Sequence, residues 1–148
     1  MTRLEIERTI GAPPATVFER CCDFANSADT VEGIEKVDML TDGPVGPGTR
    51  FRETRIMFGR EATEEMEVGV YEPPRRYTLL AESHGARYHS EFLFDEVPQG
   101  TRVKLTFDAT PVTLFAKVMA VLTKPMQKKV AELLAKDLDD IKASIEGS

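Results

Sequence analysis

The sequence predicts an α+β fold in which a curved antiparallel sheet of about six to seven strands packs against one long C-terminal helix. Apolar residues between Phe115 and Ile145 recur at steps of three and four, which is the spacing of one helix face. Upstream of them, strand-like segments are separated by turns rich in Gly and Pro. Consecutive hairpins form a meander, and only the C-terminal helix is long enough to cover its apolar face.

The N-terminal segment predicts one strand followed by two short helices. Arg3–Ile10 alternates between apolar and polar residues, as a half-buried strand does. The prolines that follow break this strand and open a short helix from Pro14 to about Asp23. Asn26–Glu32 is polar and is expected to form a second helical turn. The predicted order of elements is therefore β-α-α-β-β-β-β-β-β-α.

Six further strands are expected between the short helices and the long one. They are Ile34–Leu40, Thr49–Phe58, Arg60–Tyr71, Tyr77–Ser83, Arg87–Asp95 and Thr101–Ala109. Each pair of neighbours is separated by Gly, Pro or both, which supply the backbone angles that tight turns need. These residues predict a meander rather than parallel strands joined by helices.

The long helix is expected to span Thr110–Glu146. Thr110 and Pro111 form a start signal, because a hydroxyl can cap the helix and proline fits its first turn. Gly147 marks the stop. An unbroken helix of this length would be longer than a compact domain of this size is wide. Pro125 therefore predicts a bend.

Composition favours one soluble domain spanning residues 1–148. The net charge of −6 disfavours a general surface for nucleic acid or anionic membranes. The only cysteines, Cys21 and Cys22, are adjacent and cannot staple a fold, which fits a reduced compartment. No apolar run approaches the roughly 18 residues that a membrane span requires, and no apolar signal region begins the chain. We expect a cytoplasmic protein without stable membrane insertion.

Four turn segments resemble those of a known superfamily. The chain reads IGAPPATVF at residues 10–18, GPVGPGTRF at 43–51, YEPPRR at 71–76 and EVPQGTRV at 96–103. Occurring in this order, the four segments resemble the START/Bet v 1-like (SRPBCC) superfamily, closest to its bacterial polyketide cyclase/dehydrase-like branch. The resemblance covers essentially the whole chain. It implies a helix-grip fold with an apolar cavity, and a ligand such as a lipid, polyketide, hormone or aromatic compound.

Strand alternation places several polar side chains on the apolar faces of their strands. The catalytic candidates among them are Glu53, Arg55, Glu64 and Tyr88. A carboxylate in an apolar cavity would have a raised pKa and could serve as acid or base, whereas beside Arg55 it would stay ionised. The alternative interpretation is that Glu53 and Arg55 form a wet, structural ion pair near a strand end.

The same alternation and the helix stripe predict the ligand-binding residues. They are Phe51, Met57, Met66, Val68, Ser90, Phe92, Phe107, Val118, Leu122 and Met126. The last three lie near Pro125, so a bend there is expected to set the width of the pocket. His84 and His89 are spaced poorly for a shared metal, and no metal or other cofactor is expected.

Three functions are compatible with these observations. The preferred hypothesis is binding, transport or sequestration of a small hydrophobic or amphipathic ligand between the sheet and the C-terminal helix. The second is a polyketide cyclase or aromatase-like enzyme that uses a cavity carboxylate with Arg or Tyr. The third is a protein-interaction module, which would need an exposed apolar patch. The sequence leaves open whether the protein is a monomer or a homodimer.

Overall fold

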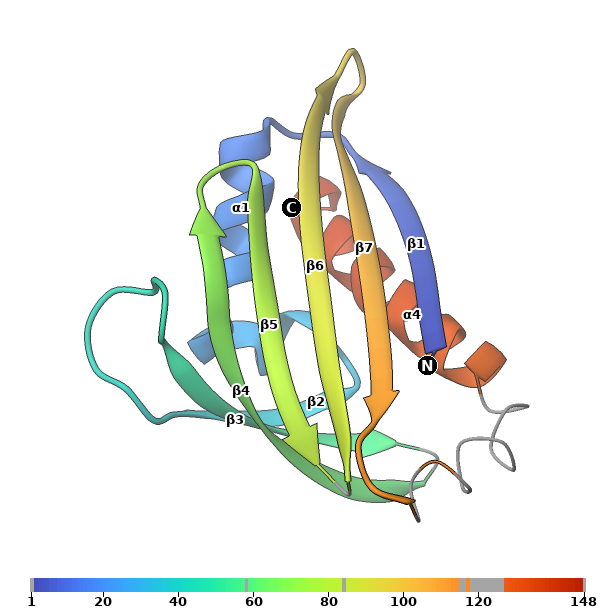
Figure 1. The fold of residues 1–148 in the computed structure, drawn as a ribbon. Helices are drawn as coiled ribbons and strands as arrows, with labels where there is room; N and C mark the ends of the chain where they lie inside the picture. Colours follow the sequence, from blue (N-terminus) through green and yellow to red (C-terminus); the bar gives the residue numbers. More distant parts are fainter. Residues whose placement is uncertain (1, 58, 84, 115–116, 118–126, 148) are drawn as a thin grey trace.

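The computed structural model describes residues 2–57, 59–83, 85–114, 117 and 127–147. Its sheet has the spatial order β1-β7-β6-β5-β4-β3-β2, and every neighbouring pair is antiparallel. The strands are β1 (Thr2–Ile10), β2 (Ile34–Met39), β3 (Arg50–Met57), β4 (Arg60–Glu72), β5 (Arg76–Ser83), β6 (Ala86–Val97) and β7 (Gly100–Pro111). Figure 1 shows the sheet curving around the helices. The predicted α+β architecture is therefore confirmed, with seven strands.

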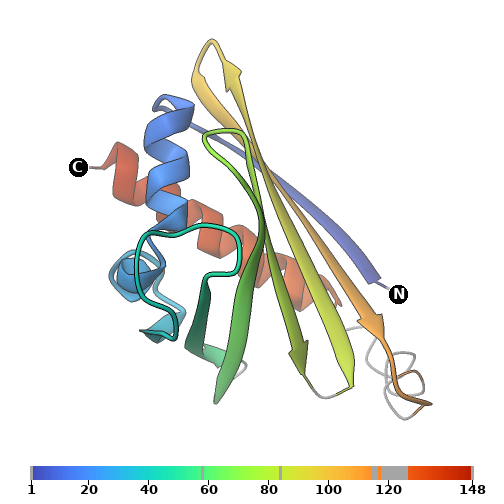
Figure 2. The same ribbon diagram turned by 60° about the vertical axis from the view of Figure 1, so that its left-hand side comes forward.

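The helices lie on one face of the sheet, as Figure 2 shows. They are α1 (Pro14–Cys22), the 3₁₀ turn η1 (Phe24–Asn26), α2 (Ser27–Thr30) and α4 (Gln127–Glu146). We call the sheet face that carries these helices the inner face. Both predicted short helices are confirmed. No stretch of helix in the described parts of the chain combines the length and apolar character that crossing a bilayer requires.

The predicted start of the long helix at Thr110 is wrong. Thr110 and Pro111 belong to β7, where they pair with Arg87 and Ala86 of β6. Proline is tolerated there because it ends the ladder, where its missing N–H costs little. Leu114 and Lys117 are helical, and α4 then runs from Gln127 to Glu146. The predicted bend at Pro125 lies outside the described residues.

The C-terminal part of α4 is tied to the N-terminal elements by polar contacts. The Arg8 Nε donates to Asp139 Oδ1 at 2.7 Å, and the Gly11 N–H donates to Glu146 Oε2 at 2.7 Å. Arg20 of α1 donates to the Ser144 hydroxyl at 2.8 Å. These contacts hold α4 diagonally across the inner face, with its C-terminal end beside α1 (Figures 1 and 2).

Candidate functional site

One half of the inner face is filled with side chains. Phe18 of α1 packs against Tyr77 and Phe94, with ring centroids 5.6 and 5.1 Å apart, and Phe24 stacks on Phe51 at 4.4 Å. We call this region the filled half. Its members are buried and comprise Ile6, Ile10, Val17, Phe18, Cys21, Cys22, Phe24, Phe51, Val68, Tyr77, Phe94, Val103, Leu105 and Leu138. The filled half is the hydrophobic core of the protein.

The other half of the inner face carries less buried side chains. We call this region the sparse half and define it as Leu79, Ala81, Tyr88, Ser90, Phe107 and Ala109, all of which are half-buried. They form two rows across the sheet, because Ser90 pairs with Leu79 and Phe107 while Tyr88 pairs with Ala81 and Ala109. Tyr88 and Phe107 stack with ring centroids 5.8 Å apart.

The predicted ligand-binding residues are divided between these two halves. Ser90 and Phe107 belong to the sparse half, and the half-buried Met66 and Phe92 lie on its border with the core. Phe51 and Val68 are 1% and 0% exposed and pack in the filled half. The Met57 side chain and Val118, Leu122 and Met126 lie outside the described residues. The structure therefore groups four of the predicted residues around the sparse half.

Glu53 and Arg55 face inward, as the alternation predicts. Arg55 Nε donates to Glu53 Oε1 at 2.8 Å, while its Nη2 donates to Asp137 Oδ2 of α4 at 3.0 Å. The three side chains are only 13%, 11% and 18% exposed for Arg55, Glu53 and Asp137 respectively. The predicted Glu53–Arg55 ion pair is therefore present, but the expectation that it is wet is wrong, because α4 covers the pair and supplies a second carboxylate. The network connects the helix to the sheet.

Burial and charge oppose each other in this network. Burial alone would lower the pKa of Arg55, but the two carboxylates outweigh burial and raise that pKa above its ordinary value. Burial raises the pKa of Asp137 above 3.8, and Arg55 offsets only part of that effect. Arg55 thus stays charged and has its Nε and Nη2 atoms engaged, so it acts as a structural cation.

Asp137 was not singled out by the sequence reasoning. The sequence does contain a pattern that places Asp137 on the buried side of the helix. Asp137 lies three residues after Leu134 and four before Ile141, two members of the apolar helix stripe. An acid at such a position faces the same side as the stripe and needs a cationic partner there. Arg55, assigned inward by strand alternation, was the available candidate.

Glu64 and Tyr88 are the remaining predicted catalytic candidates. Glu64 pairs with Glu53 across β3 and β4, and both Glu64 and Tyr88 are half-buried. Burial raises the pKa of Tyr88, and the nearby Glu64 carboxylate raises it further. A phenol in this setting remains a hydrogen-bond donor at neutral pH. Glu64 therefore acts electrostatically on a hydroxyl of the sparse half.

The other chemistry-bearing residues do not join this site. His89 is exposed, and it occupies the sheet face opposite Tyr88 and Ser90. His84 lies outside the described residues. Both cysteines are buried, which raises the pKa of the Cys21 thiol to about 12. Within the described ranges, no group of three or more His, Cys, Asp or Glu side chains could hold a metal ion.

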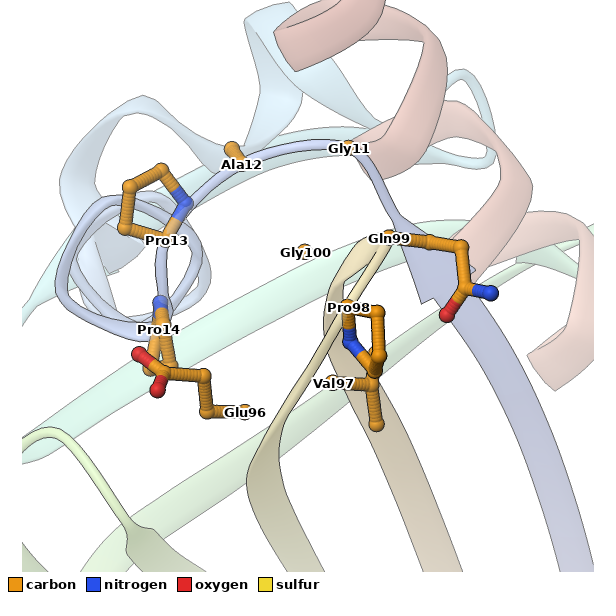
Figure 3. A pocket seen from close by; sticks show the side chains of 9 residues that line it. All are labelled: Gly11, Ala12, Pro13, Pro14, Glu96, Val97, Pro98, Gln99 and Gly100. Atoms are coloured by element: carbon orange, nitrogen blue, oxygen red, sulfur yellow. The ribbon is translucent and has the colours of Figure 1, made fainter.

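Among the surface hollows formed by described residues are two that do not lie between the inner face and α4. The larger, of about 620 Å³, separates the β1–α1 connection from the β6–β7 turn, and Figure 3 shows these segments facing each other. Gly100 permits their close approach, because a Cβ there would lie 2.2 Å from the Ile10 carbonyl oxygen. The other, of about 430 Å³, lies between α2 and α4. The cavity expected between sheet and helix stays a prediction.

Residues 1–146 match the family described as Polyketide cyclase / dehydrase and lipid transport. The chain belongs to this family. No curated protein sequence matches the chain significantly. The family covers both enzymes and transport proteins, so membership alone does not choose between catalysis and binding.

Solved structures of other proteins share the fold of this polyketide cyclase/dehydrase and lipid transport family member. TTHA0849 from Thermus thermophilus superposes with a TM-score of 0.82 at 21% identity, covering 99% of this chain and 98% of that one. Ara h 8.0201 gives 0.68 at 15% identity, with 99% coverage of both chains. The di-domain ARO/CYC protein StfQ of the steffimycin biosynthetic pathway gives 0.79 at 11% identity; 98% of this chain matches 50% of StfQ. These likenesses confirm the helix-grip, Bet v 1-like fold.

Proposed function

We propose that this protein binds a small hydrophobic or amphipathic ligand between the sparse half of the inner face and α4. The observation that carries the proposal is the lower burial of the sparse half, in which three of the six side chains are small. Tyr77, Phe92 and Phe94 occupy inner positions in or beside the core, whereas Ala81, Ser90 and Ala109 occupy inner positions of the sparse half. Small residues on a concave sheet face leave room for a guest molecule.

The chemistry of the sparse half suits a mostly apolar ligand with one polar group. Phe107, Leu79 and the ring of Tyr88 offer apolar surface, while the Tyr88 hydroxyl and Ser90 offer hydrogen-bonding groups. Each buried CH₂ of a ligand would contribute about 0.8 kcal/mol. A single hydrogen bond to Tyr88 or Ser90 would orient the polar end of the ligand and contribute about 1 kcal/mol.

Filling the sparse half tests this proposal. Ser90→Trp places an indole on the inner face, while His89→Trp places the same group on the opposite face of the same strand. We expect the first variant to bind 1-anilinonaphthalene-8-sulfonate at least about tenfold more weakly than the wild type, because the indole occupies the site. The second variant should bind this dye as the wild type does.

Two further measurements make the comparison decisive. Thermal unfolding must show that both variants are folded, since a loosened core also binds this dye. The natural protein contains no tryptophan, so indole fluorescence reports on each new side chain alone. Equal dye binding by two folded variants would refute a site on the inner face. Native mass spectrometry of the wild type would then show whether a ligand is retained elsewhere.

A second function is favoured by the proximity of Glu64 and Tyr88. In a cyclase or aromatase-like reaction on a poly-β-ketone, Glu64 would accept a proton from a carbon between two carbonyls. The Tyr88 O–H would donate a hydrogen bond to the carbonyl oxygen on which negative charge develops. Glu53 and Arg55 are less suited to these roles, because each already holds the other and Arg55 also holds Asp137.

Conservative substitutions separate this enzymatic proposal from binding alone. Glu64→Gln and Tyr88→Phe should each lower the turnover of a poly-β-ketone thioester by roughly a hundredfold or more, the usual contribution of a general acid or base. Dye binding should change little, because the apolar surface stays in place. Turnover that persists in both variants would remove these roles, and its absence in the wild type would favour the binding proposal.

A further inference from the structure

A small apolar surface is exposed where the chain leaves β7. Leu114 is 80% exposed and Val112 is 38% exposed. The Val112 N–H donates to the Gly85 carbonyl oxygen at 2.8 Å, which fixes the backbone of this segment to the β5–β6 turn. A helical turn follows, with the Lys117 N–H bonded to the Thr113 carbonyl oxygen at 2.9 Å. Leu114 is thus held in the open by an ordered backbone.

Exposed lysines follow this surface along the chain. Lys117 is exposed, and so are Lys128 and Lys129 in the first turn of α4. The end of β7 and the start of α4 lie at the same end of the molecule in both ribbon views (Figures 1 and 2). No ion pair joins these three lysines to another described residue.

Positive charge is concentrated in one segment of the sequence that includes this region. Between Asp108 and Glu132 the chain contains four lysines and no acidic residue. The whole chain nevertheless carries a net charge of −6. The acidic excess therefore lies in the remainder of the protein. Residues 109–131 are therefore basic, although the chain as a whole is acidic.

We propose that Val112, Leu114, Lys117, Lys128 and Lys129 form a docking surface for an anionic lipid bilayer. Leu114 and Val112 enter the boundary between headgroups and acyl chains, where apolar side chains are stabilised. The lysines contact lipid phosphates. Such docking is peripheral and reversible. It is independent of the proposed ligand site, because none of these five residues belongs to the inner face.

An exposed apolar residue beside lysines distinguishes a bilayer from other anionic partners. Binding to a nucleic acid would depend on the lysines and would gain little from Leu114. A bilayer interface uses both components, since it offers phosphates and hydrocarbon within a few ångströms of each other. The two kinds of side chain should therefore contribute separately. Loss of either one alone should weaken binding to anionic vesicles.

Vesicle co-sedimentation tests this surface. Wild-type protein is mixed at low salt with phosphatidylcholine vesicles that contain or lack phosphatidylglycerol. We expect binding only to the phosphatidylglycerol vesicles, with a decrease as salt is added. Lys128→Glu combined with Lys129→Glu should lower the partition coefficient by at least about thirtyfold, because losing the attraction of two lysines accounts for that factor and the new glutamates add repulsion. Leu114→Ser, which keeps the charge, should lower it several-fold.

Matched controls keep these outcomes specific. Lys36→Glu combined with Arg52→Glu gives the same change in net charge on exposed positions of β2 and β3. Leu80→Ser removes a leucine that is 39% exposed on the outer face of β5. Both controls should bind as the wild type does. Failure of the wild type to bind phosphatidylglycerol vesicles overturns the proposal, and so does an equal loss in the controls.

The alternative occupant of this surface is a second copy of the chain, and a measurement of molecular mass in solution tests for it. If the surface instead joins two copies of this chain, wild-type protein should be dimeric without vesicles and Leu114→Ser should be monomeric. That result, together with no vesicle binding, overturns lipid docking. Dye binding by the inner face is measured on the same samples. Because the two sites share no residue, loss of vesicle binding with normal dye binding refutes only the docking surface.

Discussion

The filled and sparse halves of the inner face share strands β5, β6 and β7 and differ in what covers them. In the filled half, α1 adds Val17 and Phe18 to the aromatic rings of the sheet, and Val17 is 0% exposed. In the sparse half, residues such as Ser90 and Ala109 face the same way and remain half-buried. Strand alternation decides which side chains face inward, whereas the covering helix and side-chain volume decide which of them form a core.

This difference suggests that one half of the sheet serves stability and the other serves ligand binding. The filled half contributes most of the apolar burial that stabilises the fold, while the sparse half keeps surface available for a ligand. The Arg55 network lies at the border, where it fastens α4 of the C-terminal region to β3. Changes in the filled half should therefore affect stability first. Changes in the sparse half should affect binding first.

The largest expected difference is between two phenylalanines of the inner face. Phe94→Ala should lower the free energy of unfolding by about 3–5 kcal/mol, because it removes a ring packed against Phe18 and Tyr77 in a fully covered region. Phe107→Ala should cost about half of that or less, since Phe107 is only half-buried. Urea denaturation of both variants measures the difference. Equal losses would show that the two halves are packed alike.

The border network gives the next largest effect. Arg55→Met should lower the free energy of unfolding by about 3–5 kcal/mol at neutral pH, because Glu53 and Asp137 would remain buried without their cation. Asp137→Asn should cost less, because Arg55 keeps Glu53 and the desolvation of a charged Asp137 is relieved. Urea denaturation at neutral pH ranks the two variants. A larger loss for Asp137→Asn would contradict this account.

The pH dependence of Arg55→Met follows from the direction of the Asp137 pKa. Burial raises that pKa above 3.8 even beside Arg55, and without Arg55 the opposing effect is gone. Between the ordinary pKa of an aspartate and the raised pKa of Asp137, the folded variant keeps a proton on Asp137 that the unfolded chain has lost. Its free energy of unfolding should therefore rise as pH falls through this window. A loss of stability on acidification, in excess of that of the wild type, would refute this sign.

Much of this arrangement could be predicted from the sequence. Turn residues and alternation located all seven strands and assigned Glu53, Glu64 and Tyr88 to the inner face. The start of α4 could not be located, because Thr110 and Pro111 fit both a helix start and the end of a strand. Pairing with β6 decided between them. The environment of Arg55 was equally inaccessible, since it depends on Asp137, which is distant in sequence and enters the site only through tertiary packing.

Tyrosine ionisation distinguishes the two halves with a smaller effect. Burial raises the pKa of Tyr77 in the filled half well above 10.0, and it raises the pKa of Tyr88 less strongly. For each phenol the folded state holds its proton more tightly than the unfolded chain does. Its contribution to stability is thus complete below pH 10 and is lost as pH rises through the folded pKa.

An alkaline titration followed by tyrosinate absorbance checks this order. We expect Tyr88 to ionise before Tyr77, and Tyr77 to ionise only together with unfolding. Tyr88→Phe should remove an early step of the titration, whereas Tyr77→Phe should remove the step that coincides with the loss of circular dichroism. If Tyr77 ionises in a folded protein ahead of Tyr88, the ring is not enclosed as the filled half requires.

The last comparison concerns how easily a small reagent reaches the two halves. The variant used is expected to leave stability almost unchanged. Cys21 and Cys22 are buried in the filled half, and burial raises the pKa of Cys21 to about 12. Ser90→Cys adds a thiol to the sparse half. Iodoacetamide should modify this new thiol roughly a hundredfold or more faster than the natural cysteines, because reaction requires an accessible thiolate. Peptide mass spectrometry measures the three rates separately.

Saturating dye should slow only the modification of residue 90. Equal rates at all three positions would mean that the sparse half is as closed as the core, and they would remove the basis for a ligand site there.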